Sequence, residues 1–255
     1  MIRPRLIPIL LIEDKRLIKT FQFKKPMYLG DPMNTIKIFN EKYADELIIL
    51  DKGARRKGTP DFEYLSEIAS EAFMPLSYGG AIKSLNIAEQ VFRVGFEKVI
   101  LSSLLFDNPN EIKVISNRFG SQSVVVQINV KKNIWGKMMV FDYRNAKCVT
   151  SLDEKYISKI IQLEVGEIVL NFVDQDGMAT GIKGHFVENI CKLSTVPVIV
   201  SGGLGNLEQM KDAFAVGASA VAGSRFFCLQ GTHLAPLIKY PSDQEILSLL
   251  PKEVP

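Results

Sequence analysis

Two glycine-rich turns, each matched by small or hydroxyl residues further along the chain, are the residues best suited to chemistry in this sequence. The turns are Gly79-Gly80-Ala81 and Ser201-Gly202-Gly203, and their partners are Ser102-Ser103 and Gly223-Ser224. Glycine lets backbone N–H groups approach an anion closely, the start of a following helix adds a positive dipole, and hydroxyl groups donate hydrogen bonds. We therefore predict a phosphate-binding site at each turn. The alternative is that the glycines only reverse the chain.

The two turns belong to an internal repeat. The segment that starts at Pro75 lines up with the segment that starts at Pro197, and the match continues where Gly95 lines up with Gly217 at the same offset of 122 residues. An offset near half the chain length predicts two similar halves. We place these halves at about residues 1–120 and 121–240, within a single domain that spans residues 1–255.

Strand-length apolar runs alternate along the chain with longer segments whose apolar residues recur at helical spacing. Runs without polar alternation suit parallel strands that are covered by helices. Eight strand-helix units in about 250 residues predict an α/β fold of the (β/α)8 TIM barrel type. The competing open sheet usually has a GxGxxG turn after its first strand, and this chain has none there. The expected strands are Leu6–Ile12, Glu46–Asp51, Pro75–Ser77, Lys98–Leu101, Val124–Val130, Glu167–Asn171, Val198–Ser201 and Ala220–Ala222. The expected helices start at Pro32 after a capping Asp31 and at Pro109 after a capping Asn108, and cover Phe62–Ala72, Leu152–Leu163, Lys183–Leu193 and Leu207–Val216.

The composition argues against several classes of protein. Among 255 residues, 47% are hydrophobic, and 31 Lys and Arg residues against 28 Asp and Glu residues give a formal charge of +3. Without a basic stripe we expect no nucleic-acid partner. The apolar stretch before Glu13 is too short to span a membrane and lacks a signal-peptide cleavage site, so we expect a cytoplasmic protein without a membrane partner. The distant Cys148, Cys191 and Cys228 predict neither disulfides nor a metal site, and no cofactor is expected.

The chain resembles a known family, the cyclase subunit of imidazole glycerol phosphate synthase. The resemblance includes Arg5-Leu-Ile-Pro, Gly30-Asp-Pro, Asp174-Gln-Asp-Gly177 and the segment from Ser201 to Asn206. It implies a barrel of two duplicated halves that forms a heterodimer with a glutaminase subunit docked at its N-terminal face. Ammonia from that subunit would pass through the barrel to a bisphosphorylated substrate at the C-terminal face. The two turns would hold its phosphates, and Lys19 would also face it.

Two departures from this family concern the catalytic acid and base. Family cyclases have one aspartate near the end of the first strand and another on the fifth strand, and the matching residues here are Leu11 and Asn129. Leucine cannot transfer a proton, and an amide has no useful pKa near neutrality, so we expect normal cyclase chemistry to be lost. Asp51, Asp174 and Asp176 remain at strand ends as candidate acid or base residues. The alternative role for these three is helix capping and loop hydrogen bonding.

The starts of the expected strands carry a different set of charges. Two cations and two anions at these positions can satisfy one another in a partly buried setting. The resemblance implies that they form the ring that closes the ammonia passage, whereas the usual role of residues at this face is stability. The four residues are Arg5, Glu46, Lys98 and Glu167.

A kept ammonia inlet with lost cyclase acids also describes a paralogous branch of the family. That branch is associated with amidation of bacterial surface-polysaccharide sugars, as in lipopolysaccharide, and works with its own glutaminase and a separate sugar amidotransferase. Thr20–Leu29 and Asn133–Met138, which we expect to be long loops at the C-terminal face, also depart from the family, so the acceptor should differ. The leading hypothesis is therefore a subunit that conducts ammonia toward a phosphosugar or a sugar-amidation acceptor. The alternatives are an authentic cyclase of histidine biosynthesis and a phosphosugar-binding barrel without ammonia transfer.

Overall fold

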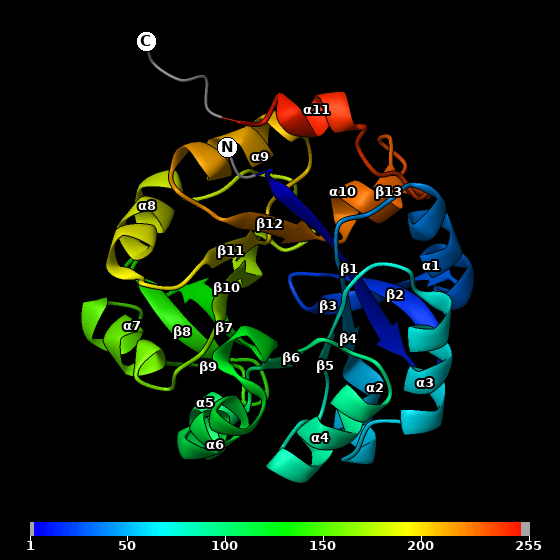
Figure 1. Ribbon diagram of the computed structural model, residues 1–255. Helices are drawn as coiled ribbons and strands as arrows, with labels where there is room; N and C mark the ends of the chain where they lie inside the picture. Colours follow the sequence, from blue (N-terminus) through cyan, green and yellow to red (C-terminus); the bar gives the residue numbers. More distant parts are fainter. Residues whose placement is uncertain (1–2, 251–255) are drawn as a thin grey trace.

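Eight parallel strands form a closed barrel in the computed structural model, which describes residues 3–250 (Figure 1). Each strand pairs with the next one along the chain, and the last strand pairs with the first to close the barrel. The expected (β/α)8 fold is confirmed, and all eight expected strands are present with end points shifted by at most two residues. The barrel strands are β1 (Arg5–Glu13), β4 (Leu47–Asp51), β5 (Leu76–Gly79), β6 (Lys98–Leu101), β7 (Val124–Lys132), β10 (Glu167–Phe172), β11 (Val198–Ser201) and β12 (Ala220–Gly223).

Helices surround the barrel and cover its outer face (Figure 1). Asp31 caps α1 as expected, because its carboxylate accepts a hydrogen bond from the Asn34 N–H at 2.9 Å. Asn108 precedes Pro109 as expected, but its side chain makes no capping bond to α6, and its backbone N–H donates to the Leu104 carbonyl at the end of α5. The main helices are α1 (Pro32–Glu41), α3 (Phe62–Glu71), α4 (Leu85–Arg93), α6 (Pro109–Phe119), α7 (Glu154–Ile161), α8 (Gly184–Leu193), α9 (Leu207–Ala215) and α11 (Asp243–Leu247). Three short helices follow strands of the barrel directly: α2 (Lys52–Lys57), α5 (Leu104–Asp107) and α10 (Arg225–Cys228).

The barrel strands separate two hydrophobic cores. Successive residues of a strand point to opposite faces of the sheet, so alternate residues face the helices and the barrel axis. The larger core lies between sheet and helices, and includes Leu6, Leu10 and Phe39. The smaller core fills the axis with the buried side chains of Ile7, Ile48, Ile100, Val125, Val169, Ile199, Ala220 and Ala222.

Two antiparallel hairpins extend the first strand of each half. The segment expected as a loop over Thr20–Leu29 instead contributes to β2 (Arg16–Phe21) and β3 (Lys24–Gly30), which pair with β1 and with each other. The other expected loop forms the turn between β7 and β8 (Met138–Asp142). Strand β8 also pairs with β9 (Lys147–Ser151). A short pair of strands, β13 (Leu229–Gln230) and β14 (Ala235–Pro236), follows α10. The search for continuous apolar runs did not reveal the hairpins because β3 and β9 contain few buried residues, and the buried polar residues Lys19 and Thr20 interrupt the apolar run of β2.

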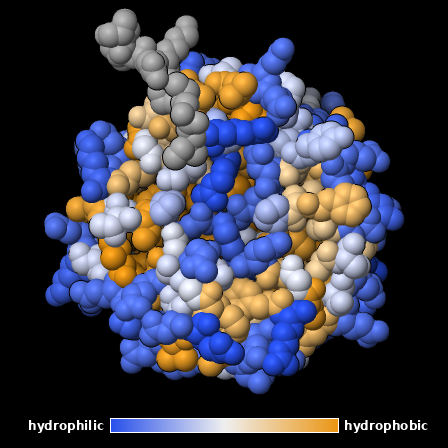
Figure 2. Space-filling model, viewed as in Figure 1, coloured by the Kyte–Doolittle hydropathy of each residue, from blue (hydrophilic) through white to orange (hydrophobic). Residues whose placement is uncertain are grey.

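The visible surface contains both hydrophilic and apolar regions. In the orientation of Figure 1, hydrophilic residues gather over the centre of the visible face and apolar residues form separate patches around it (Figure 2). No helix within residues 3–250 is long and apolar enough to cross a membrane.

The three cysteines are unpaired. Burial raises the pKa of the Cys191 thiol to about 11 and that of the Cys228 thiol to about 12, so both thiols stay protonated at neutral pH.

Tyr240 ties the C-terminal segment to the seam of the barrel. Its hydroxyl oxygen lies 2.9 Å from the Leu6 carbonyl and 2.8 Å from Asp45 Oδ2, and it accepts a hydrogen bond from the Asp45 N–H at 3.1 Å. Tyr240→Phe keeps the ring but leaves these partners unsatisfied, which should lower the free energy of unfolding by about 1–2 kcal/mol. Urea denaturation measures the change. Tyr43→Phe, at a side chain that is 86% exposed, should have no comparable effect, and equal effects of the two changes would contradict this role of Tyr240.

Candidate functional site

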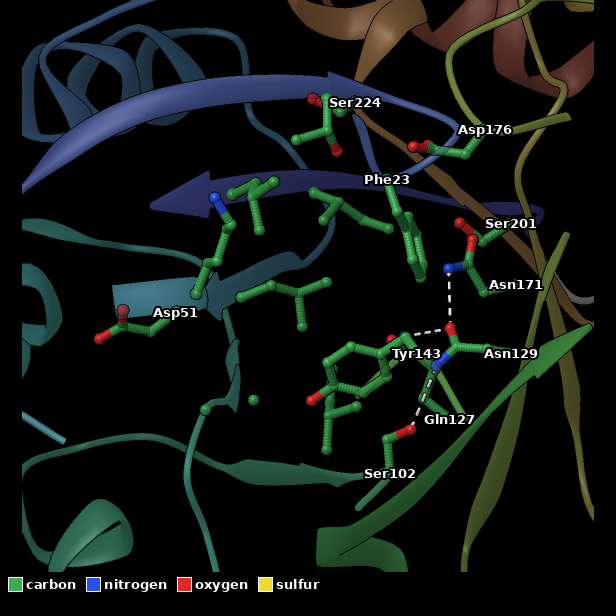
Figure 3. Close-up of a pocket in the computed structure, with 18 of the residues that line it drawn as sticks. Phe23, Asp51, Ser102, Gln127, Asn129, Tyr143, Asn171, Asp176, Ser201 and Ser224 are labelled. Atoms are coloured by element: carbon green, nitrogen blue, oxygen red, sulfur yellow. Dashed lines mark hydrogen bonds between the residues drawn. The ribbon is translucent and has the colours of Figure 1, made fainter. Parts of the chain in front are cut away.

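A cavity of about 630 Å³ opens at the C-terminal ends of the barrel strands (Figure 3). Both glycine-rich turns line it, together with residues that follow β6 and β12. The structure thus brings together almost all of the residues that the sequence selected for this end of the barrel. Those that line the cavity are Leu11, Lys19, Asp51, Gly79, Gly80, Ser102, Ser103, Asn129, Asp176, Ser201, Gly202, Gly203, Gly223 and Ser224.

The turn of the second half requires glycine. Gly202 and Gly203 have φ angles of +88° and +93°, which side chains other than glycine rarely adopt. A Cβ atom would lie 2.6 Å from the Phe172 carbonyl oxygen at Gly202, and 2.2 Å from the Gly181 carbonyl oxygen at Gly203. Across the cavity wall, Ser224 Oγ is buried and has no hydrogen-bond partner within residues 3–250. An unpaired buried hydroxyl beside a glycine turn is suited to an anion that supplies the missing acceptor.

The turn of the first half is built differently. Gly79 and Gly80 are packed tightly, since a Cβ on Gly80 would lie 2.7 Å from the Tyr78 hydroxyl oxygen. Ala81 takes the place of Gly203 in the repeat and has a φ of +50°. The helix after this turn does not offer its N-terminus, because the Leu85 N–H donates to the Glu111 carboxylate at 2.7 Å. The dipole of α4 therefore stabilises the Glu111 carboxylate instead of a bound anion.

Lys19 is a buried cation beside the second-half turn. Its side chain is 4% exposed, and its Nζ lies 2.9 Å from Asp176 Oδ1 and 2.5 Å from the Thr20 carbonyl oxygen. The ion pair neutralises the buried ammonium group, which would otherwise be costly to desolvate. The carboxylate of Asp176, one of the candidate acids, is therefore engaged in an ion pair with Lys19.

The other two candidate acids make structural hydrogen bonds. Asp51 lines the cavity, but its Oδ1 accepts the Ala54 N–H at 2.8 Å and so caps α2, while Oδ2 accepts the Tyr78 hydroxyl at 3.3 Å. Its carboxylate points away from the centre of the cavity (Figure 3), and burial raises its pKa. Asp174 does not line the cavity; its Oδ2 accepts the Lys132 N–H at 2.9 Å. The geometry thus gives Asp51 and Asp174 the capping and loop roles.

Asn129 is the centre of an uncharged polar network at the base of the cavity (Figure 3). Its Oδ1 accepts hydrogen bonds from Gln127 Nε2 and Asn171 Nδ2, both at 3.0 Å, and its Nδ2 donates to Ser102 Oγ at 3.3 Å. Gln127 and Asn171 were missed by the sequence analysis. The available signal was the placement of Gln127 and Asn129 two residues apart in an otherwise apolar strand, which sets both on the axial face. Leu11 is half-buried and adds an apolar surface to the same cavity.

The four charged residues of the strand starts form a closed ring at the opposite end of the barrel. Arg5 lies 3.2 Å from Glu46 and 2.7 Å from Glu167, and Lys98 lies 3.2 Å from Glu46 and 3.0 Å from Glu167. Each carboxylate therefore stands between two cations. Ser77 adds a hydrogen bond to Glu46 at 3.0 Å. The side chains are 7–29% exposed, so the ring is partly screened from solvent.

The axial core connects the ring with the cavity. Along β1, the residues Arg5, Ile7, Ile9 and Leu11 follow one another at every second position, and β7 continues from Val125 to Gln127 and Asn129. The ring is thus followed by an apolar section and then by the amide network. Within residues 5–223 the axial core contains only aliphatic side chains of Ile, Val, Leu and Ala.

An aromatic pair lies at the mouth of the cavity. Phe23, in the β2–β3 turn, meets Tyr143, in the β8–β9 turn, with ring centroids 6.3 Å apart and planes at 89° (Figure 3). Arg55 of α2 lies over the Tyr143 ring at 5.0 Å from its centroid. The hairpins of the two halves therefore meet over the site.

Comparisons with known proteins agree with this architecture. Residues 5–231 match the family described as histidine biosynthesis protein. The chain is 43% identical over 243 residues to a Pseudomonas aeruginosa protein provisionally named imidazole glycerol phosphate synthase subunit hisF2, covering 94% of this chain and 97% of that protein. It is 39% identical over 254 residues to a Leptospira borgpetersenii protein provisionally named imidazole glycerol phosphate synthase subunit HisF, covering 98% and 100%. A Vibrio vulnificus protein provisionally named subunit hisF3 is 43% identical over 251 residues, covering 96% and 95%.

Gly223 allows a test of the predicted second anion site that spares the fold. A Cβ on Gly223 would have no atom within 4 Å, so Gly223→Asp should fold normally while placing a negative charge beside Ser224. We expect binding of ribose 1,5-bisphosphate, which carries a phosphate at each end, to weaken at least about tenfold through like-charge repulsion, as measured by isothermal titration calorimetry. Gly223→Ala is the control for added volume alone. Unchanged affinity in Gly223→Asp would show that no anion binds there.

Proposed function

The chain belongs to the histidine biosynthesis protein family, and from this premise we propose that it is a cyclase-like subunit of a glutamine amidotransferase system. In this role it receives ammonia from a glutaminase partner at the N-terminal barrel face. The ammonia then passes along the barrel axis to a phosphorylated acceptor at the C-terminal face. The observation that carries the proposal is the alignment of a closed ion ring, an aliphatic axis and a polar cavity along one barrel.

The charged ring is suited to the inlet. Lys98 and Arg5 join the same two carboxylates from opposite sides, so one cation can move while the other keeps Glu46 and Glu167 paired. A ring of this kind can open transiently without leaving a carboxylate isolated, which would be costly in a partly buried setting.

The aliphatic axis favours the neutral form of ammonia. Transfer of an unpaired ammonium ion from water into an apolar environment carries a large desolvation cost, whereas neutral ammonia has a far smaller one. Ile7, Ile48 and Val169 form part of this section. The axis thus supports delivery of a nucleophile rather than of an inert ammonium ion.

The exit of the axis also favours neutral ammonia. Asn129, Asn171 and Gln127 present amides there, and the carboxylates among the described cavity residues already bind a cation or a backbone N–H. These carboxylates are Asp51 with Ala54, Asp107 with Arg144, and Asp176 with Lys19. Uncharged amides offer hydrogen bonds without stabilising ammonium as a carboxylate would. Leu11 and Asn129 also stand where the family has the aspartates that act as acid and base in cyclase chemistry.

Sugar amidation is the more specific part of the proposal. Relatives with the names hisF2 and hisF3 accord with a branch of additional family copies. Loss of the cyclase acids at Leu11 and Asn129 favours a separate acceptor enzyme, a sugar amidotransferase that acts on surface-polysaccharide sugars.

Lys98→Ala tests the ammonia passage. In cells of the source organism, we expect this variant to incorporate several-fold less 15N from amide-labelled glutamine into surface polysaccharide, because the inlet ring has lost one of its two cations. A high concentration of ammonium salt should restore incorporation, since ammonia then reaches the acceptor from solution. Mass spectrometry of the polysaccharide gives the readout.

Arg93→Ala is the matched control for Lys98→Ala. Arg93 is 73% exposed on α4 and pairs with Glu89 of the same helix. Equal labelling in the two variants, or the absence of any glutaminase that copurifies with the protein, would count against the conduit.

A double substitution separates this proposal from an authentic cyclase. The natural protein supplied with ammonium salt should not convert the bisphosphorylated cyclase substrate at the rates usual for enzymes, about 1–10³ s⁻¹. Leu11→Asp combined with Asn129→Asp should gain activity, because positioned proton transfer contributes about 10²–10⁴-fold in rate. Leu11→Asn is the control for polarity without a titratable group. Normal turnover by the natural protein would establish the cyclase instead.

A further inference from the structure

We propose that Arg55 and Lys83 form a cationic clamp that binds the terminal phosphate dianion of a phosphomonoester in the first half of the cavity. The inference rests on the phosphorylated acceptor of the proposed function but not on the passage of ammonia. Here the clamp means these two side chains only. Both line the cavity, Arg55 from α2 and Lys83 from the segment between β5 and α4.

The clamp stands beside the first glycine-rich turn. Lys83 lies two residues after Ala81, the last residue of that turn. Its Nζ is 3.7 Å from the position that a Cβ of Gly58 would occupy, at the end of the helix that carries Arg55. The two side chains therefore line the same cavity from neighbouring elements of the first half. An anion held by the turn would lie within their common field.

The cavity has an excess of positive charge that is confined to the clamp. Five cations line it, and neither Arg55 nor Lys83 has a carboxylate within salt-bridge distance among residues 3–250. The other three are compensated, with Lys19 on Asp176, Lys52 on Glu13, and Arg144 on Asp107 and Asp142. Asp51 also lines the cavity and has no cation within salt-bridge distance among the described residues, so the two clamp cations and Asp51 together leave a net charge of +1. The clamp cations are the two that remain available to pair with a phosphomonoester, which carries about −1.5 to −2 at pH 7.

Tyr143 orients one member of the clamp. The guanidinium of Arg55 lies 5.0 Å from the centre of the Tyr143 ring, and that ring is braced edge to face by Phe23. An arginine on an aromatic face keeps its N–H groups free for an oxygen anion in the plane of the guanidinium. The contact reduces the conformational freedom that Arg55 would lose on binding a ligand. The β8–β9 hairpin therefore contributes to binding through Arg55.

The two ends of the cavity differ in the charge that they present. At the second-half turn the nearby Lys19 is already neutralised by Asp176, which leaves glycine N–H groups and the unpaired Ser224 hydroxyl. At the first-half turn the clamp adds net positive charge. A phosphomonoester should therefore bind at the first half in preference to a phosphodiester, which carries a single negative charge.

Calorimetric titration of the full chain tests the clamp, with ribose 5-phosphate as the monoester and its methyl phosphodiester as the comparison. The natural protein should bind the monoester at least about tenfold more tightly than the diester. Arg55→Ala and Lys83→Ala should each reduce monoester affinity by at least about tenfold and narrow the difference between the two probes. Tyr143→Leu should weaken binding, and Tyr143→Phe should retain it because the aromatic face is kept.

Arg56→Ala is the matched control, since Arg56 lies on the same helix but outside the cavity, 2.5 Å from Asp14 and 63% exposed. Far-ultraviolet circular dichroism confirms that each variant is folded. Two results would contradict the clamp: equal binding of the monoester by Arg55→Ala and Arg56→Ala, or equal binding of the two probes by the natural protein. Neither result would contradict a phosphate site at the glycine-rich turn. If the natural protein binds neither probe, the clamp and the phosphorylated acceptor both fail, and the Lys98→Ala experiment still decides the ammonia passage.

Discussion

The closure of eight parallel strands around one axis is the constraint on which every feature of the site depends. Closure forces alternate residues of each strand toward the axis, so a strand of modest length contributes one residue to each successive axial layer. On β1 these residues are Arg5, Ile7, Ile9 and Leu11. Because the neighbouring strands are in parallel register, residues of similar height form layers across the barrel. Four strands contribute the charged ring, the next layers are aliphatic, and polar groups lie at the mouth. A one-residue shift in register would exchange this axial row for residues of the outer core.

Charge is compensated at one end of the barrel and left uncompensated at the other. The four-residue ring at the strand starts balances two cations with two anions in a closed cycle, so it presents no net charge to the axis. At the cavity, Arg55 and Lys83 keep their charge without a carboxylate partner among the described residues. This asymmetry is consistent with the proposed entry of a neutral molecule at the ring and binding of an anionic molecule at the mouth. The amide network around Asn129 separates the two regions without introducing a charge of its own.

The two halves share a common plan but differ in detail. Each half places a hairpin after its first strand, and the hairpins meet through Phe23 and Tyr143. The second turn has two glycines with positive φ, whereas the first has Ala81 at the corresponding position. Such differences give the two ends of the cavity different properties, although both turns connect a strand to the helix that follows it.

The sequence by itself determined the barrel and its eight strands, because hydrophobic periodicity and the number of strand-helix units can be read along the chain. It also located the turns and the four charged residues, since each stands at an end of a strand. Only the tertiary structure decided which of these groups are free to act. Asp51, Asp174 and Asp176 look alike in the sequence. In the structure Asp51 caps a helix, Asp174 accepts a hydrogen bond from the Lys132 N–H, and Asp176 forms an ion pair with Lys19. The interactions of Gln127, Asn171, Arg55 and Lys83 depend on neighbours brought together by barrel closure, including Tyr143 from the opposite half. Such long-range partners have no signature in the spacing of residues along one strand, so only the folded chain identified them.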